Sequence, residues 1–418
     1  MERRTFLRGL GALGCSAAAH PFMTTITLAQ SASGGAPLGD HRLVVIILRG
    51  AMDGLDVVRP VDDPMLARLR PSLAGAAGLA SLPLADRFGL HPSLGRLLPL
   101  WAKGELAFAH AVSTPYRDKR SHFDGQDLLE AGTGMDVPLG TRREGWLNRM
   151  LQAVPGLTAE TAFAVGRDAL PLLSGRAPTM SWTPEVRLAL SAQSQLLLEH
   201  VWHDDDLFRE SGMEAMQLAA EASAVGNGGE DDADMSMMAA GEPAAPAAPS
   251  RAMATVDGLI DFAVSRLQGD TRIAAFSQGG WDTHRNQGRT LAGPLSQLEH
   301  SVLRMADGLG AQVWGKTILL AMTEFGRTVA ENGSKGTDHG TGGVMLLAGG
   351  ALKGGRVLGR WPGLAEADLY DRRDLMPTSD VRAWAAWAMH HLYGLDRGVL
   401  EAAVFPGLDM GSDPGIIA

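Results

Sequence analysis

Apolar runs separated by amphipathic stretches extend along most of the chain. The first run, residues 43–48, consists of β-branched and aliphatic side chains without a polar break, which is typical of a strand buried on both faces of a parallel sheet. Similar runs lie at 106–112, 273–276, 317–322 and 344–348. We therefore expect a sheet built mainly from these segments.

Helical patterns fall between and after the apolar runs. They cover residues 93–103, 122–131, 144–153, 186–201, 290–309 and 379–393. Strands that alternate with helices form a mainly parallel central sheet with helices on both faces. The sequence therefore predicts the α/β fold class.

One domain accounts best for the order of these elements. Residues 226–250 are acidic, rich in Ala and Pro, and unable to pack a core, which is typical of a flexible insert. The apolar runs after this insert continue the pattern before it, so we expect a single domain over 42–400 that follows a spacer at 30–41 and precedes a C-terminal tail at 401–418. A domain boundary at the insert is the alternative.

The first 29 residues have the features of a signal peptide. Arg3 and Arg4 precede a short apolar stretch, and the small residue Ala29 offers a cleavage site. The paired arginines predict export by the twin-arginine translocase to the periplasm or the medium. A Sec leader, an ordinary basic N-terminus and a lipoprotein site at Cys15 are weaker alternatives. Because the apolar stretch is short and interrupted, we expect no stable transmembrane anchor.

Composition removes several function classes. With a formal net charge of −10, the chain is repelled by phosphate backbones, so nucleic acid is not expected as a partner. The only cysteine, Cys15, lies in the leader, which excludes disulfides and thiol catalysis in the mature protein. The sequence contains neither a phosphate-binding GxxxxGK[ST] loop, nor a G-x-S-x-G elbow, nor an H-E-x-x-H helix.

Polar residues follow the apolar runs, where the carboxyl ends of parallel strands bind ligands. Asp53 follows the first run in a glycine-containing turn, and Ser121 directly precedes the helix expected at 122–131. Asp53 is a candidate metal ligand, and Ser121 is a candidate nucleophile beside the cation Arg120. The structural interpretations are that Asp53 is only a turn residue and that Ser121 is only a helix N-cap.

Two later runs end in further candidates for metal binding. Asp282 and His284 stand two apart on an extended segment, so their side chains point the same way and suit one divalent ion. Glu324 and Arg327 follow the fourth run and suit metal or oxyanion binding, while His339 lies in a Gly-rich loop. The structural alternatives are a hydrogen bond between Asp282 and His284, a surface salt bridge for Glu324 and Arg327, and a turn position for His339. Carboxylates with imidazoles predict one or two divalent ions, such as Zn, Mn, Ca or Mg.

Several ordered motifs together resemble one known family. The segments that carry them are 49–56, 120–132, 279–284, 323–328 and 338–343. Over residues 42–395 the chain resembles the domain-of-unknown-function family 1501, which is in turn similar to the alkaline phosphatase and sulfatase superfamily. This resemblance implies an alkaline-phosphatase-like three-layer sandwich with a mainly parallel central sheet flanked by helices.

The resemblance also implies roles for the candidate residues. Asp282, His284 and His339 correspond to the ligands of one metal ion. Asp53, Glu324 and Ser121 correspond to a second, oxygen-rich site, in which Phe325 stands where the superfamily has a ligating histidine. An oxygen-rich site prefers Ca or Mg over Zn.

The expected function is that of a metal-dependent hydrolase acting on a small-molecule or polysaccharide ester of phosphate or sulfate. Ser121 would be the nucleophile, and Arg327 or Arg120 would clamp the oxyanion. The alternative is a non-catalytic binding or assembly protein of the cell envelope or of polysaccharide, with a degenerate metal site. The missing histidine at Phe325 is its main support. Three other histidines, His91, His110 and His300, are expected to be structural.

Overall fold

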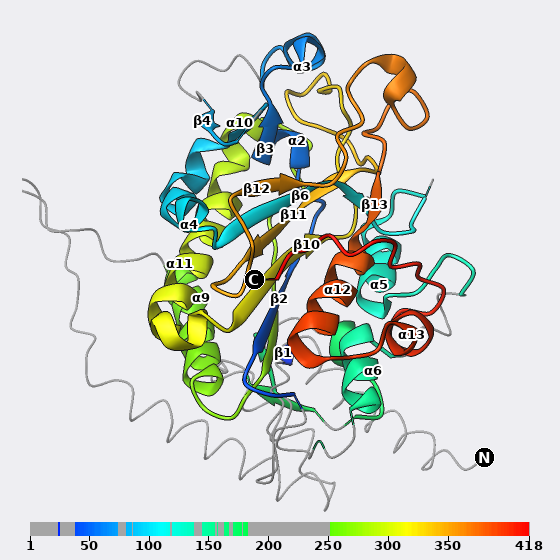
Figure 1. Ribbon diagram of the computed structural model, residues 1–418. Helices are drawn as coiled ribbons and strands as arrows, with labels where there is room; N and C mark the ends of the chain where they lie inside the picture. The colour runs from blue at the N-terminus through cyan, green and yellow to red at the C-terminus, as the bar shows by residue number, and fades with distance from the viewer. Residues whose placement is uncertain are drawn as a thin grey trace, which may run out of the picture. The chain divides into compact units, whose positions relative to one another are not determined.

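A seven-stranded sheet forms the centre of the computed structural model. Its strands are β2 (Arg42–Leu48), β6 (Leu106–Ser113), β9 (Ile273–Gln278), β10 (Thr317–Thr323), β11 (Gly343–Ala348), β12 (Arg356–Leu358) and β13 (Ser379–Asp380). The strand order is β12-β6-β11-β10-β2-β9, with β13 also paired to β6. Only β11 runs antiparallel to its neighbours in this sheet, so the sheet is mostly parallel (Figure 1).

The structure describes the part of the chain that carries this sheet. The described residues are 24–25, 38–73, 81–85, 87–117, 119–137, 144–154, 157, 163–166, 170–177, 179–182 and 251–417. The helix expected at 186–201 and the acidic insert at 226–250 lie outside them. Of the proposed leader, only the short strand β1 (Thr24–Thr25) is described, paired with β7 (Phe163–Gly166).

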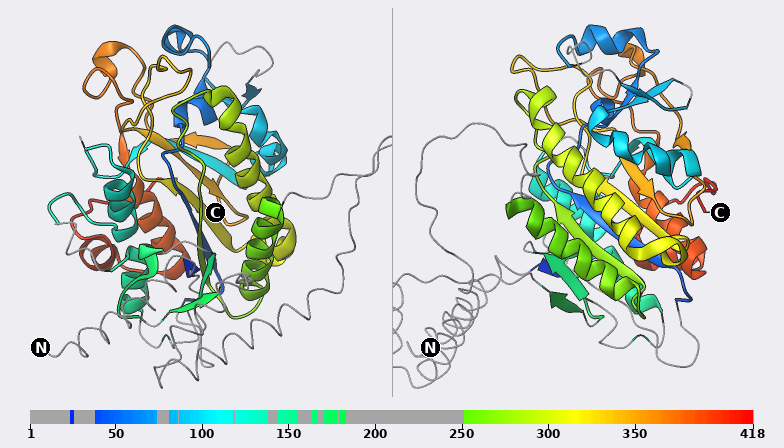
Figure 2. Two further views of the ribbon diagram at one scale, coloured as in Figure 1. Left: turned by 180° about the vertical axis from the view of Figure 1, so that it is seen from behind. Right: turned by 90° about the vertical axis from the view of Figure 1, so that its left-hand side faces the viewer.

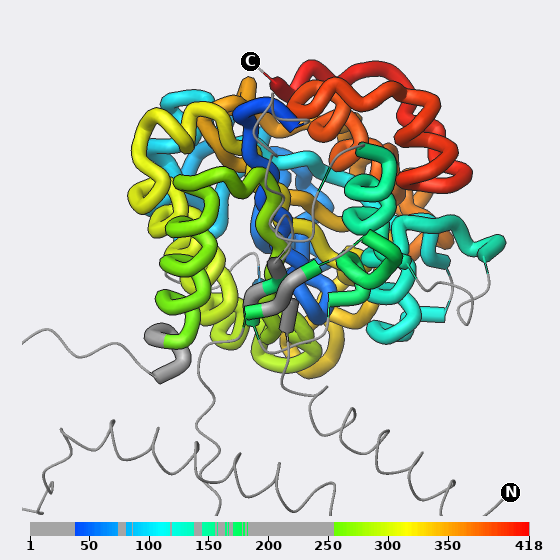
Figure 3. Tube along the Cα trace, turned by 90° about the horizontal axis from the view of Figure 1, so that it is seen from below, coloured from blue at the N-terminus to red at the C-terminus, as the bar shows by residue number. Residues whose placement is uncertain are grey.

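Helices cover both faces of the sheet, as the alternating pattern predicts. One face carries α4 (Leu98–Lys103), α9 (Arg251–Leu267) and α11 (Ala292–Trp314), and the other carries α5 (His122–Ala131), α6 (Trp146–Ala153) and α12 (Val381–Tyr393) (Figures 1 and 3). Helices α9 and α11 pack side by side (Figure 2). Every residue of β2 is buried, which explains its unbroken apolar run.

Smaller elements surround this core. They are α2 (Gly54–Val57), β3 (Val58–Pro60), α3 (Pro64–Leu69), β4 (Leu82–Pro83), β5 (Phe88–Leu90), β8 (Met180–Trp182), α10 (Gln287–Thr290) and α13 (Arg397–Val399). Short segments of other helix types are Pro92–Leu97, Pro171–Leu173, Glu366–Asp368 and Leu400–Val404. No helix in the described ranges is both long and apolar enough to cross a membrane.

The five strands expected from the apolar runs are all present, with small shifts of their ends. The helix expected at 93–103 begins as a 3-10 turn at Pro92 and becomes α-helical at Leu98. The pattern at 290–309 divides into the short α10 and the longer α11, which extends to Trp314. The C-terminal segment packs onto the core, because Phe405, Met410 and Ile416 are buried.

A buried histidine in β6 makes the stability of this fold depend on pH. His110 donates from Nε2 to the carbonyl of Val58 and accepts at Nδ1 from the amide of Ala111, which requires a neutral ring. Burial lowers the pKa of His110 to about 4, from 6.5. Its folded pKa lies below its unfolded pKa, so its contribution is complete above pH 6.5 and is lost as the pH falls toward 4.

We therefore expect the free energy of unfolding to fall by roughly 3 kcal/mol through His110 over this pH window. Urea unfolding between pH 7 and pH 4, compared with a His110→Gln variant, measures this contribution. The variant lacks this group's titration, so its stability should depend less steeply on pH than that of the parent chain. Equal pH slopes in the two proteins would contradict a neutral, buried His110.

Candidate metal centre

The candidate site lies where the parallel strands end. Strands β2, β6, β9 and β10 run in the same direction, so the loops after them emerge at one edge of the sheet, the upper end in Figure 1. This edge carries all of the sequence-predicted site residues that directly follow those strands.

Four side chains from three loops converge at this edge. They are His122, Asp282, His284 and His339. Nε2 of His284 lies 2.9 Å from Nε2 of His339 and 3.0 Å from Oδ1 of Asp282. The same Oδ1 atom lies 3.4 Å from Nε2 of His122 and 3.5 Å from Nε2 of His339. The structure thus brings together three of the predicted metal ligands and adds His122.

The three imidazole rings are all oriented through Nδ1. Nδ1 of His122 lies 2.8 Å from Oε1 of Glu324, and Nδ1 of His284 lies 3.2 Å from Oδ1 of Asp338. Nδ1 of His339 lies 2.7 Å from the carbonyl oxygen of Arg120. An ionised carboxylate or a carbonyl only accepts, so each neutral ring carries its hydrogen on Nδ1 and directs the Nε2 lone pair toward the centre.

This arrangement fits one divalent ion. Nε2 of His122 is buried and has no hydrogen-bond partner. With both Nδ1 atoms protonated, the facing Nε2 atoms of His284 and His339 cannot bond to each other. A tetrahedral shell with bonds of about 2.0–2.1 Å has edges of roughly 3.3–3.4 Å. Four of the six separations between the donor atoms are 2.9–3.5 Å and lie around this value, and all the donor atoms lie within 4.8 Å of one another.

Helix α5 and an aromatic side chain hold His122 in place. His122 is the first residue of α5, and Ser121 caps this helix through Oγ. The Phe325 ring stacks on that of His122 at 5.3 Å and lies 5.2 Å from that of His339. In this chain Phe325 packs against two candidate ligands, and His122 supplies an imidazole from another strand end.

Arg327 donates a hydrogen bond to Asp282 and orients its carboxylate. Trp281, which precedes Asp282 in the chain, is buried and donates from Nε1 to the carbonyl of Gln278. This hydrogen bond fixes the segment after β9. Nη2 of Arg327 donates to Oδ1 of Asp282 at 2.6 Å. Partial burial favours the neutral acid, but this bond and the positive charge of Arg327 keep the pKa of Asp282 below its usual value. The carboxylate is therefore charged and preorganised for a cation.

Glu324 lies behind His122 rather than among the four converging side chains. Its Oε1 accepts from the amide of Gly50, from Gln126 and from His122, while Oε2 accepts from Thr323. Burial opposes ionisation, yet the hydrogen bond from His122 keeps the pKa of Glu324 low, and the same bond raises the pKa of His122. Glu324 thus has the place of an orienting carboxylate.

We expect Glu324→Gln to weaken metal binding by about 10–100-fold, the usual effect of altering a carboxylate that orients a ligating imidazole. Competition with a chromogenic chelator measures the change. Glu299→Gln is the matched control. Glu299 is also buried, but it lies in α11 and accepts from the amide of Arg96. Equal affinities for the two variants would contradict the orienting role.

Asp53 belongs to a different buried network. Its Oδ1 caps α2 by accepting from the amides of Leu55 and Asp56, and its Oδ2 accepts from Arg70, Gln287 and Thr337. Both oxygens therefore have partners from the protein. The structure places Asp53 and Glu324, two members of the predicted oxygen-rich site, in separate hydrogen-bond networks.

Residues 40–396 match the model of a family described as proteins of unknown function (DUF1501). The chain belongs to this family. The match runs from just before β2 to just beyond α12 and includes all four converging side chains. Comparison of this DUF1501 chain with curated proteins and with solved structures found no match.

The arginines that were predicted to bind an oxyanion in this DUF1501 chain differ in how far their N–H groups are already used by the protein. Arg327 is buried, and each of its three nitrogens donates within the protein, to the carbonyls of Gly50, Ala51, Trp281 and Thr337 and to the carboxylate of Asp282. The Arg120 side chain is 40% exposed, with Nη2 3.8 Å from Asp374. Arg373, which the sequence did not single out, donates to the carbonyl of His339 and is 35% exposed. Arg120 and Arg373 are thus the cations that flank His339.

His122 is the candidate ligand that sequence reasoning missed. It follows β6 within the same loop as Ser121, so the rule applied to the other strand ends also covers it. The sequence did not predict that the carboxylate of Asp338 and the backbone carbonyl of Arg120 orient the other two rings. Three other histidines, His91, His110 and His300, lie outside the cluster, as expected.

Proposed function

We propose that this protein is an exported, metal-dependent hydrolase of phosphate or sulfate esters that uses one ion, with Ser121 as the nucleophile. The observation that carries the proposal is the buried, unpartnered Nε2 of His122, which faces three other donors at the edge where parallel strands end. The export route and the relation to the alkaline phosphatase and sulfatase group are parts of the same proposal. A bound divalent ion supplies positive charge that stabilises a transferring phosphoryl or sulfuryl group.

Ser121 stands next to this centre in the chain. Its amide donates to Oη of Tyr116 at 2.8 Å, while its Oγ accepts from the amide of Asp124 at the long distance of 3.4 Å. The residues on either side contact the cluster, since Arg120 binds His339 and His122 belongs to it. The N-terminal end of α5 favours negative charge on Oγ.

In the proposed reaction, Oγ of Ser121 forms a bond to phosphorus or sulfur as the ester P–O or S–O bond breaks. The hydroxyl proton passes to solvent, and the departing alkoxide takes a proton from water. Water then attacks the phosphorus or sulfur of the serine ester, the bond from that atom to Oγ breaks, inorganic phosphate or sulfate leaves, and Oγ takes a proton from solvent. Arg120, whose side chain is partly exposed, would bind the peripheral oxygens, whereas each nitrogen of Arg327 already donates within the protein.

Assays with 4-nitrophenyl phosphate and 4-nitrophenyl sulfate on zinc- or manganese-loaded protein test this proposal. We expect Ser121→Ala to lower turnover at least about a thousand-fold, because it removes the attacking atom. Ser93→Ala is a suitable control, since Ser93 lies in the Pro92–Leu97 turn. Full activity of Ser121→Ala would overturn its role as nucleophile.

One observation favours a non-catalytic function instead. Asp53 and Glu324, the two carboxylates predicted for a second metal site, both accept hydrogen bonds from protein donors and are therefore not free to bind an ion. A single bound ion with no turnover of either ester would favour a binding or assembly protein of the envelope or of polysaccharide. The same assays therefore separate the two functions.

A further inference from the structure

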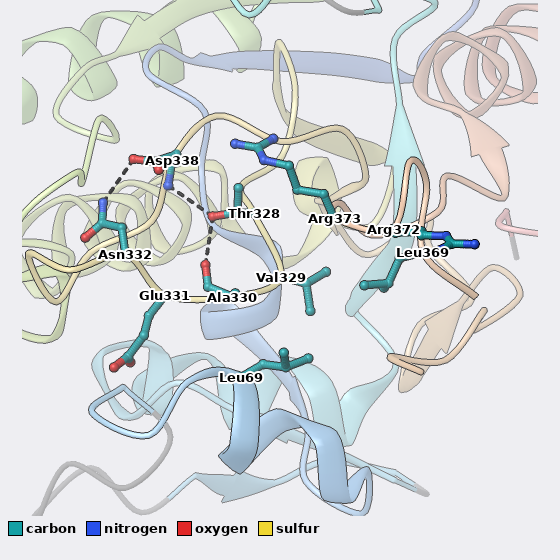
Figure 4. A pocket seen from close by; sticks show the side chains of 10 residues that line it. All are labelled: Leu69, Thr328, Val329, Ala330, Glu331, Asn332, Asp338, Leu369, Arg372 and Arg373. Atoms are coloured by element: carbon teal, nitrogen blue, oxygen red, sulfur yellow. Dashed lines mark hydrogen bonds between the residues drawn. The ribbon is translucent and has the colours of Figure 1, made fainter. Parts of the chain in front are cut away.

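A pocket of about 250 Å³ adjoins the metal centre and shares Asp338 with it (Figure 4). Its walls come from the end of α3, from the loop after β10 and from the segment that follows the turn Glu366–Asp368. The lining residues are Leu69, Thr328, Val329, Ala330, Glu331, Asn332, Asp338, Leu369, Arg372 and Arg373. The four converging side chains are not among them, so the pocket is a separate binding space.

Most polar groups in the pocket wall are satisfied by the protein. Thr328 donates to the carbonyl of Ala330 and accepts from the amide of Asp338 (Figure 4). Asn332 donates to Asp338 and to the carbonyl of His284, and its own oxygen accepts from Ser334 and Gly336. The carboxylate of Glu331 is bound to Ser72 and Leu73. These groups shape the wall without needing a ligand.

Two charged groups retain capacity for a ligand. Asp338 uses Oδ1 for Asn332 and His284, while its Oδ2 has no partner among the described residues. Arg373 uses Nη1 for His339 and Asp374, and its Nε and Nη2 have none within the described ranges. Figure 4 shows the Arg373 side chain reaching toward Asp338 and Thr328, whereas that of Arg372 points away.

Apolar side chains complete the pocket. Leu69, Val329 and Leu369 lie on the side away from Asp338 (Figure 4). A ligand here contacts one acceptor-only carboxylate, one donor-only guanidinium and the half-buried side chain of Leu69, behind which Val329 and Leu369 are buried. A sugar ring matches this combination, because adjacent hydroxyl groups both donate and accept while the C–H face of the ring is apolar.

We propose that this pocket binds a sugar ring, with its hydroxyl groups on Asp338 and Arg373 and its apolar face on Leu69. The volume suits one ring, since pockets for larger organic ligands usually hold about 300–1,000 Å³. The inference rests on the proposed function and names its substrate class: the ring carries the phosphate or sulfate ester that the adjoining centre cleaves. Asp338 and Arg373 link the two spaces, because they also contact His284 and His339.

Calorimetric titration of metal-loaded Ser121→Ala protein with glucose 6-sulfate, glucose 6-phosphate, methyl sulfate and methyl phosphate tests this proposal. The sugar esters should bind at least about tenfold more tightly than the methyl esters, a difference of roughly 1.4 kcal/mol. Leu69→Trp, which fills the pocket from α3, should remove that preference without changing metal content. Val61→Trp is the matched control, because Val61 is 55% exposed and is not a lining residue.

Leu69→Ala provides a second test that adds no bulk, and it should reduce the preference for sugar esters in part. Equal binding of sugar and methyl esters, or a preference that persists in Leu69→Trp, would overturn the pocket assignment even if esters are hydrolysed. Sugar binding that depends on Leu69 without any hydrolysis would uphold the pocket and refute the proposed reaction. A sulfated trisaccharide identifies the source of the ring: tighter binding than glucose 6-sulfate indicates a polymer end, equal binding indicates a free sugar ester, and both support the pocket.

Discussion

Replacement of Arg327 by methionine is expected to lower the free energy of unfolding by about 3–5 kcal/mol, because it leaves several buried backbone carbonyls without their hydrogen-bond donor. The guanidinium is buried and joins four backbone carbonyls and one carboxylate from the loops after β2, β9 and β10. Methionine fills much of the volume but donates nothing, so these acceptors lose their partner. Urea unfolding at neutral pH measures the change.

Arg304→Met is the control for this prediction. Arg304 pairs with Asp257 and Asp261 at the surface between α9 and α11, and such exposed pairs contribute about 0–1 kcal/mol. Arg327→Met should also weaken metal binding, since Asp282 loses the bond that orients it. A loss no larger than that of Arg304→Met would show that Arg327 does not fasten the three loops together.

The second large effect is expected for His122→Ala, which should weaken metal binding by more than about 100-fold. This change removes a donor atom and not merely its support, so its effect should exceed that of altering Glu324. The helix itself should persist, because the Ser121 cap and the buried side of α5, including Leu128 and Leu129, are unchanged. Metal affinity from chelator competition, with a melting curve of the metal-free protein, separates the two effects.

His300→Ala is the appropriate comparison for His122→Ala. His300 also contacts a carboxylate, Asp257, but it lies on α11 and outside the cluster. Its removal should leave metal affinity unchanged. Comparable losses in the two variants would mean that the change at His122 acts through the fold and not through ligation.

The fold was predictable where burial leaves a strong pattern. Residues 43–48 and 317–322 lie in strands that are buried on both faces, so their sequences are almost free of polar residues. The direction of β11 could not be predicted, because an apolar run at 344–348 is the same in a parallel and an antiparallel strand. Helix α9 was not predicted, since it directly follows the low-complexity segment.

The candidate site was predictable only in part, for a related reason. Asp282, His284 and His339 stand out because they follow strands or Gly-rich turns. Whether a buried carboxylate faces an ion or a protein donor depends on residues far away in sequence. Asp53 is hydrogen-bonded to Arg70 and Gln287, whereas Glu324 is hydrogen-bonded to His122 and Gln126. These partners are known only once the chain is folded.

The central claim is that His122, Asp282, His284 and His339 together bind one divalent ion. Elemental analysis of the purified full chain, combined with X-ray absorption at the edge of the bound metal, tests this claim most directly. The account predicts one equivalent of metal with three nitrogen donors and a carboxylate oxygen at about 2.0–2.2 Å, lost in His122→Ala and retained in His300→Ala. A chain that holds no metal, even after addition of zinc, manganese or calcium, or an ion that remains bound in His122→Ala, would contradict it.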